Sequence, residues 1–124
     1  MNHKRLLTID DEEAIQIVIK FGIGLSAGWE VLSASGGTTG IETAQRELPD
    51  VILLDVMMPE MDGIATFKAL QANPLTARIP VIFLTAKAQA DERRQFNDLG
   101  ISGTITKPFN SLDLPDRIAK ILNW

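Results

Sequence analysis

Short apolar runs alternate along the chain with longer segments in which apolar residues recur every three or four positions. The short runs predict strands, and the recurring pattern predicts amphipathic helices. Regular alternation of the two is typical of parallel strands joined by helical crossovers. Five such units fit the sequence, with predicted strands at residues 6–9, 29–35, 51–54, 81–84 and 103–106.

The run at residues 51–54 contains no polar residue, and Pro80 introduces a similar run at residues 81–84. A strand in the middle of a parallel sheet is covered on both faces, so its side chains do not alternate between apolar and polar. We therefore predict that residues 51–54 form a central strand of the sheet.

The first predicted helix begins near residue 12 and carries a wide apolar stripe. Because apolar residues occupy more than one side of it, we expect this helix to be deeply covered. Glycine at positions 22, 24 and 28 leaves its end open, since glycine is a poor helix former. The apolar residues of this stripe are Ala14, Ile15, Ile17, Val18, Ile19, Phe21 and Ile23.

Four further helices are predicted. One opens at Thr39, which has capping-box spacing to Glu42, and Pro49 stops it. The next helix follows Gly63 and closes at Asn73-Pro74, and a mostly polar helix spans residues 88–99. The apolar anchors of the four helices are, in order, Ile41, Ala44 and Leu48; Ile64, Phe67 and Leu70; Phe96 and Leu99; and Leu114, Ile118, Ile121 and Leu122.

Composition narrows the class of protein. At 124 residues and 45% hydrophobic content, residues 1–124 fit one domain with a core that needs no covalent staples. The chain has no cysteine, which excludes disulfides and thiolate metal sites, and its net charge of -4 argues against direct nucleic acid binding. The N-terminal residues resemble neither a signal peptide nor a membrane span, so we expect a cytoplasmic protein without membrane contact.

Polar side chains follow four of the predicted strands directly: Asp10, Asp11, Asp55, Thr85 and Lys107. Ligands of open α/β sheets bind outside the carboxyl ends of the strands. If these strands are parallel neighbours, the carboxylates, the hydroxyl and the ammonium meet at one edge of the sheet. We expect such a crevice to bind a divalent metal and to take part in phosphoryl transfer.

The predicted cluster of carboxylates has an electrostatic consequence. Clustered carboxylates repel one another, so without a cation at least one of them should keep its proton at neutral pH. A ligand set made only of hard oxygen atoms favours magnesium. We therefore expect Mg²⁺ as the cofactor.

Each of these residues alone has a simpler interpretation. The acidic run at residues 10–13 could favour the positive end of the first helix, and Asp55 could be an ordinary turn residue. Thr85 and Lys107 taken singly fit exposed turns. Their coincidence at consecutive strand ends favours a shared site.

Four segments together resemble the receiver domains of two-component response regulators. They occur in the order and at the separations typical of receivers, and the resemblance covers essentially the whole chain. The segments are Thr8-Ile9-Asp10-Asp11-Glu12, Leu53-Leu54-Asp55-Val56-Met57-Met58-Pro59 with Met61-Asp62-Gly63, Leu84-Thr85-Ala86-Lys87 and Thr106-Lys107-Pro108-Phe109. The resemblance implies an α/β, flavodoxin-like fold, a doubly wound five-stranded parallel sheet with strand order 2-1-3-4-5 and five helices.

The resemblance also implies a phosphoacceptor switch that catalyses only its own phosphorylation and dephosphorylation. Asp55 would take the phosphoryl group from a phosphohistidine of a sensor histidine kinase or histidine phosphotransfer protein, assisted by Thr85 and Lys107. The implied metal ligands are Asp10, Asp11, Asp55 and the backbone carbonyl of Met57, with Asp10 acting mainly through water. A downstream protein partner would read the changed surface, and the protein would be a monomer or weak dimer.

Two backbone features and two side chains acquire expected roles from this resemblance. The Lys107-Pro108 peptide bond is expected to be cis, and Gly63 is expected to permit a tight turn before the third helix. Lys87 and Met57 are expected at the mouth of the site, where they could tune the access of water.

One position departs from the receiver pattern. Receivers usually carry Tyr or Phe three residues before the lysine, but Thr104 occupies that place here and the chain has no tyrosine. In receivers that aromatic ring normally moves inward on phosphorylation, following the hydroxyl group at the position of Thr85. Either the loop after the fourth strand carries the signal from Thr85 alone, or the output uses another face.

Two other classes share parts of this pattern. A phosphohydrolase of the haloacid dehalogenase type combines an Asp nucleophile with Thr, Lys and acidic metal ligands, and it is the nearest enzyme. It requires a second Asp two residues after the nucleophile, where this chain has Met57. A flavodoxin-like cofactor carrier requires glycine and hydroxyl groups after the first strand, where the acidic residues 10–13 would repel a phosphate.

Overall fold

A computed structural model of the chain describes residues 3–59, 61–86 and 90–124 and contains a single parallel sheet within them. Its strands are β1 (Arg5–Ile9), β2 (Glu30–Ala34), β3 (Val51–Asp55), β4 (Val81–Thr85) and β5 (Gly103–Thr106). They pair in the order β2-β1-β3-β4-β5, with every neighbouring pair parallel. The predicted strands, their order and the doubly wound fold class are confirmed.

The middle of the sheet is wholly buried. Every residue of β3 and β4 is buried, whereas the edge strands β2 and β5 are only partly covered. Leu54 of β3 lies between Ile9 of β1 and Phe83 of β4 in the strand register. The absence of polar alternation in residues 51–54 therefore marked a central strand correctly.

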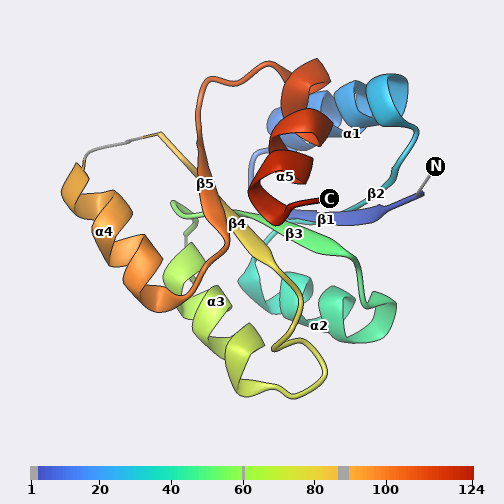
Figure 1. Cartoon of the computed structure of the whole chain (residues 1–124). Coiled ribbons are helices and arrows are strands. Elements are labelled where there is room, and N and C mark those ends of the chain that lie inside the picture. The colour runs from blue at the N-terminus through green and yellow to red at the C-terminus, as the bar shows by residue number, and fades with distance from the viewer. Residues whose placement is uncertain (1–2, 60, 87–89) are drawn as a thin grey trace.

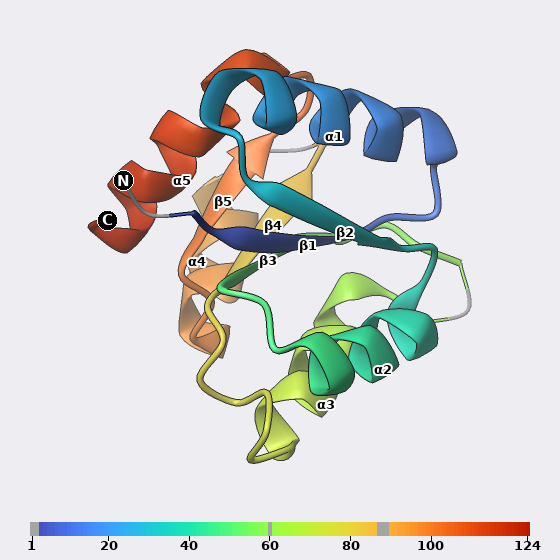
Figure 2. The ribbon, with the colours of Figure 1, turned by 90° about the vertical axis from the view of Figure 1, so that its right-hand side faces the viewer.

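Helices cover both faces of the sheet (Figure 1). They are α1 (Glu13–Ala27), α2 (Gly37–Glu47), α3 (Gly63–Ala72), α4 (Ala90–Leu99) and α5 (Leu114–Leu122), with the 3₁₀ turn η1 (Ser111–Asp113) directly before α5. Figure 2 shows α1 and α5 on one face and α2 and α3 on the other. The apolar cluster of the second face also includes Phe96, so α4 covers the same face of the sheet as α2 and α3.

The first helix differs from the expectation that it is deeply covered. Ile19 and Ile23 are buried, but Ile17, Val18 and Phe21 are 49%, 46% and 67% exposed. A helix on an open sheet turns only one side toward the strands, and the apolar stripe of α1 is wider than that side. Its end is defined at Gly28, which adopts the left-handed conformation with φ of 69°.

The second helix corrects two further expectations. It begins at Gly37 rather than Thr39, and no side chain caps its first turn. Leu48, expected on the inner face, is instead the left-handed residue that ends the helix, and it is 53% exposed. Pro49 follows directly, as expected of a helix stop.

The third helix begins where the sequence predicts. Asp62 caps it by accepting a hydrogen bond from the Ala65 N–H at 2.8 Å. A Cβ atom on Gly63 would lie 2.6 Å from the Asp55 carbonyl oxygen, so glycine is required for this close turn. None of the described helices is both long and apolar enough to cross a membrane.

Candidate functional site

The carboxyl ends of four parallel strands bring the predicted site residues to one edge of the sheet. Asp55 and Thr85 are the last residues of β3 and β4, while Asp10 and Lys107 directly follow β1 and β5. A backbone hydrogen bond continues the pairing of β4 and β5 to Lys107, whose N–H donates to the Thr85 carbonyl oxygen at 2.8 Å. Asp10, Asp55 and Thr85 are all buried.

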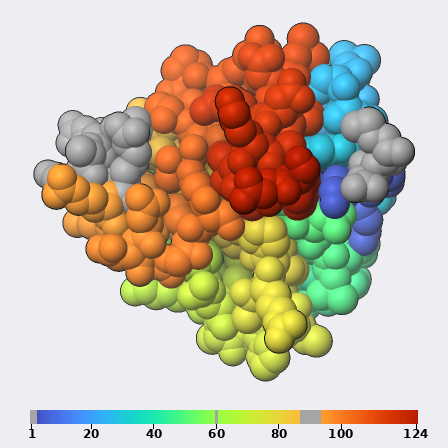
Figure 3. Space-filling view, viewed as in Figure 1, coloured from blue at the N-terminus to red at the C-terminus, as the bar shows by residue number. Residues whose placement is uncertain are grey.

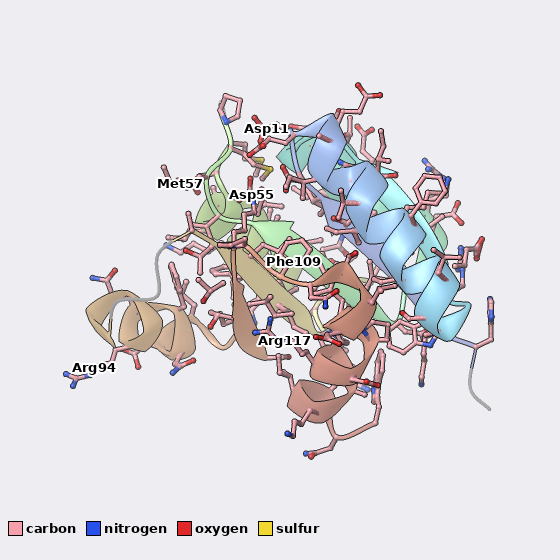
Figure 4. All side chains as sticks on the ribbon, turned by 90° about the horizontal axis from the view of Figure 1, so that it is seen from above. Asp11, Asp55, Met57, Arg94, Phe109 and Arg117 are labelled. Atoms are coloured by element: carbon pink, nitrogen blue, oxygen red, sulfur yellow. The ribbon has the colours of Figure 1, made fainter. Side chains whose placement is uncertain are left out.

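Three carboxylates form the acidic part of the site. One oxygen from each of Asp10, Asp11 and Asp55 lies within 4.8 Å of the other two. Asp10 is fully buried and Asp55 is 3% exposed, whereas Asp11 is open to solvent. Figure 4 shows Asp11, Asp55 and Met57 together at this edge. The cluster therefore has a buried floor and one side that solutes can reach.

Lys107 is the cation that faces this cluster. Its Nζ atom lies 3.4 Å from Asp10 Oδ2 and 3.4 Å from Asp55 Oδ1, with Glu12 Oε1 at 4.0 Å. The side chain is only 17% exposed, and the Lys107-Pro108 peptide bond is cis, as predicted. One ammonium thus bridges the two buried carboxylates.

Backbone N–H groups hold the carboxylates in place. The Glu12 N–H donates to Asp10 Oδ1 at 2.8 Å, and the Met57 N–H donates to Asp55 Oδ1 at 3.3 Å. Gln16, which the sequence analysis missed, donates from Nε2 to the carbonyl oxygens of Asp10 and Ala34, both at 2.6 Å. Its signal in the sequence is that it is the one polar residue within the otherwise apolar segment 14–19 of the first helix.

The electrostatic environment shifts the pKa values of two groups of the site, Asp55 and Lys107. Burial, followed by the nearby Asp10 carboxylate, raises the pKa of Asp55 to about 6. Burial acts to lower the pKa of Lys107, but the Asp10 and Asp55 carboxylates outweigh it and raise that pKa above its usual value. The shift of Asp55 has the expected direction. Lys107 acts against this shift, because its positive charge partly neutralises the cluster and lowers the pKa of Asp55.

The donor set fits a hard divalent cation. All three clustered side chains offer carboxylate oxygens, and among the described residues one ammonium faces them, which leaves excess negative charge. Such oxygen-only sites with an open side suit a small hydrated cation. The acidic cluster can therefore hold a metal ion.

Two expected residues lie at the margin of this site. The Met57 side chain is 76% exposed, which agrees with a place at the mouth, and its effect on water access stays a prediction. Lys87 lies outside the described residues. Thr104 lies on β5 beside Phe83 of β4.

Comparison with known proteins gives one family. Residues 6–119 match the response regulator receiver domain. The chain is 36% identical over 120 residues to the alkaline phosphatase synthesis transcriptional regulatory protein PhoP of Bacillus subtilis, covering 97% of the chain and 49% of that protein. It is 38% identical over 120 residues to the response regulator PleD of Caulobacter vibrioides, covering 97% and 26%. The chain thus spans half or less of the length of these curated relatives.

Solved structures agree with this match. The chemotaxis response regulator CheY4 of Vibrio cholerae superposes with a TM-score of 0.88 at 28% identity, covering 97% of this chain and 99% of that one. A response regulator from Desulfuromonas acetoxidans gives a TM-score of 0.85 at 28% identity, covering 97% of both chains. None of these four proteins is described as a phosphohydrolase.

Proposed function

Because the chain belongs to the response regulator receiver family of two-component signalling, we propose that Asp55 is its phosphoacceptor and that phosphorylation changes the surface offered to a partner. The observation that carries this proposal is the contact of buried Asp55 with Lys107 beside two further carboxylates. An aspartate that only forms a turn would not be expected to be buried in contact with a lysine and two other carboxylates. We also propose that residues 1–124 act as one receiver unit.

In the proposed reaction, an Asp55 carboxylate oxygen attacks the phosphorus atom of a phosphohistidine. The new O–P bond forms as the P–N bond breaks, and the imidazole leaves with the electron pair and takes up a proton. Above a pH of about 6 the Asp55 carboxylate is mostly ionised and ready to attack. Hydrolysis of the resulting acyl phosphate by water returns the protein to its starting state.

Lys107 and Thr85 have separate roles in this proposal. Charge builds up on the equatorial oxygens of the moving phosphoryl group, and preorganised donors stabilise that charge. The Lys107 ammonium already lies 3.4 Å from an Asp55 oxygen, so it needs little movement to reach a phosphoryl oxygen. The hydroxyl of Thr85, at the end of the neighbouring strand, would receive a second one.

Magnesium would be held by Asp10, Asp11, Asp55 and the backbone carbonyl of Met57, with Asp10 acting mainly through water. When bound, the ion would supply positive charge to the phosphoryl oxygens. The clustered carboxylate oxygens support this assignment because they are hard donors with excess negative charge. Asp10 would also keep Lys107 directed at the site through their 3.4 Å contact.

The proposed phosphodonor is a sensor histidine kinase or a histidine phosphotransfer protein, and the proposed reader is a downstream protein. Family membership supports both. At the mouth of the site, Met57 and Lys87 are proposed to tune the access of water to the acyl phosphate. Unchanged dephosphorylation rates in Met57→Ala and Lys87→Ala would remove that role while leaving the phosphoacceptor untouched.

Incubation with magnesium and acetyl phosphate, followed by intact-mass measurement, tests the phosphoacceptor directly. The wild type should gain the mass of one phosphoryl group and Asp55→Asn none. Asp98→Asn is the matched control, because this exposed carboxylate lies on α4 and should not affect labelling. Labelling of Asp55→Asn would overturn the proposal, and steady turnover of p-nitrophenyl phosphate would instead favour the phosphohydrolase.

A further inference from the structure

The strand that ends in Thr85 carries an aromatic ring on the face toward α4. In the register of β4 with β5, Phe83 pairs with Thr104 and Thr85 pairs with Thr106. Side chains alternate along a strand, so residues two positions apart on β4 point to the same face of the sheet. Phe83 therefore belongs to the face that carries Thr85, and at both of these positions the neighbour on β5 is a small threonine.

A ring from α4 packs against this strand. Phe96 lies on Phe83 in an edge-to-face arrangement, with ring centroids 5.1 Å apart and an interplanar angle of 81°. Phe83 is fully buried and Phe96 is 4% exposed. Thr104 is only partly buried beside them, so the ring against Phe83 on this side comes from the helix.

In the part of α4 whose side chains are described, the packing against the sheet is concentrated in this ring. Among the described side chains of α4, at residues 94–99, Phe96 is buried, Leu99 is half-buried and the other four are exposed. Figure 1 places α4 at the margin of the fold, and Figure 3 shows its outer surface along one flank of the molecule. In Figure 4, Arg94 projects away from the body of the protein. Because Phe96 anchors α4 to the sheet, a displacement of the Phe96 ring should displace the helix.

We infer that Phe96 couples the phosphorylation site to α4, acting through Phe83 as a positioning residue. The inference rests on the proposed function, because the end of β4 is displaced only if the phosphoryl group on Asp55 engages Thr85. Closely packed interiors transmit such displacements instead of absorbing them. A shift of Thr85 and Phe83 along β4 would therefore move the Phe96 ring, and α4 with it, without any aromatic side chain on β5.

The chain contains a matched control for this coupling. Phe67 of α3 also lies edge-to-face on Phe83, with centroids 5.9 Å apart, and is 3% exposed. It shares the neighbour and the burial of Phe96. The third helix, however, has further buried residues at Gly63, Thr66 and Leu70, so its position does not depend on one ring.

Amide shifts measured by NMR with magnesium and beryllofluoride, a phosphate mimic, test the coupling. In the wild type we expect shifts around Asp55 and along residues 94–99 of α4. Phe96→Leu should keep the shifts around Asp55 and lose more than half of the α4 response. Phe67→Leu should keep both, although it removes an equally buried ring from the same neighbour.

Three results would overturn the inference, and they differ in what else they affect. If the mimic binds and the α4 response survives in Phe96→Leu, or falls equally in Phe67→Leu, Phe96 has no special role and the phosphoacceptor proposal stands. If the mimic produces no shifts around Asp55 in the wild type, both proposals fail. If Phe96→Leu does not fold, the ring signals of the wild type decide: the Phe96 ring should shift more than the Phe67 ring on addition of the mimic, and shifts of equal size would overturn the inference.

Discussion

The two ends of the sheet differ in how their charged side chains are paired. At the amino end, Arg5 Nε lies 2.8 Å from Glu30 and a terminal nitrogen of Arg5 lies 2.7 Å from Glu47. Asp50 accepts a hydrogen bond from the Arg5 backbone N–H at 2.8 Å. At the carboxyl end, within the part of the chain that the structure describes, three clustered carboxylates face one ammonium, that of Lys107. The same strands thus end in bonded charges on one side and in excess negative charge on the other.

The pKa shifts follow this difference. Hydrogen bonding from Arg5 lowers the pKa of Glu47, so this carboxylate is stabilised by the folded structure. Burial and Asp10 raise the pKa of Asp55 to about 6, so the folded structure disfavours its ionised form. Ionised groups that a fold stabilises contribute to stability, whereas ionised groups that it disfavours cost stability and are common at functional sites. The comparison therefore assigns a structural role to the amino end and a chemical role to the carboxyl end.

The largest predicted effect comes from removing Lys107, the cation that the described residues place at the cluster. Lys107→Ala should slow labelling by acetyl phosphate about 100-fold, because a preorganised charge is lost where phosphoryl charge develops. Arg5→Met removes the cation of the opposite end and should leave the labelling rate unchanged. Rates from intact-mass time courses would separate the two ends. Similar slowing in both variants would contradict the comparison.

A second test measures the cost of the ionised Asp55. The folded protein, with a pKa of about 6, holds this proton more tightly than the unfolded chain, so metal-free stability should fall as pH rises from about 4 to 7. Asp55→Asn should therefore be more stable than the wild type by about 2 kcal/mol at pH 7, and by almost nothing at pH 4. Denaturant unfolding at both pH values provides the measurement. A gain in the free energy of unfolding of equal size at both pH values would show that ionisation of Asp55 is not the cause.

A third test asks how packing supports the carboxyl end. Gly22 of α1 lies so close to η1 that a Cβ would collide with Ser111. The first helix follows Asp10-Asp11 and η1 follows Lys107, so this contact connects the two sides of the site. Gly22→Ala should lose about 1 kcal/mol, since overpacking outweighs the better helix propensity of alanine.

Gly24→Ala is the matched control for this packing test. Nothing lies within 4 Å of a Cβ at that position in the same helix. This variant should gain up to about 1 kcal/mol, because alanine is the better helix former. A stabilising effect of both substitutions would show that the contact with Ser111 imposes no constraint.

The smallest predicted effect is at the amino end and has the opposite pH dependence to Asp55. The pKa of Glu47 is lowered in the folded protein. The ionised carboxylate therefore contributes to the free energy of unfolding at neutral pH, and this contribution is lost as the pH falls through that lowered value. Glu47→Gln should lower the midpoint of thermal unfolding slightly at pH 7. The difference from the wild type should shrink in acid and in high salt. A difference that grows in acid would contradict this assignment.

Much of the fold could be predicted because the pattern was local. Unbroken apolar runs identified the buried strands, and Asp10, Asp55, Thr85 and Lys107 could be placed because strand ends in a parallel sheet share one edge. The strand order itself came from the family resemblance, since periodicity alone does not rank neighbouring strands.

The remaining features depend on contacts between distant segments. The apolar stripe of α1 could not reveal that Phe21 is exposed, because the sequence does not say which side of the helix faces the sheet. The packing of Phe96 on Phe83 joins a helix to a strand through side-chain geometry. Likewise, the value of the Asp55 pKa depended on the position of Lys107, more than fifty residues away.

Magnesium titration followed by amide NMR tests the central claim most directly, because it shows which end of the sheet recruits the cation. The account predicts saturable shifts of the Asp10, Asp11 and Asp55 amides, with Glu30 and Glu47 unmoved. Asp11→Asn should weaken this binding at least about tenfold. Shifts spread evenly over both ends, or binding that Asp11→Asn leaves unchanged, would contradict the claim that the carboxyl end is a metal and phosphoryl site.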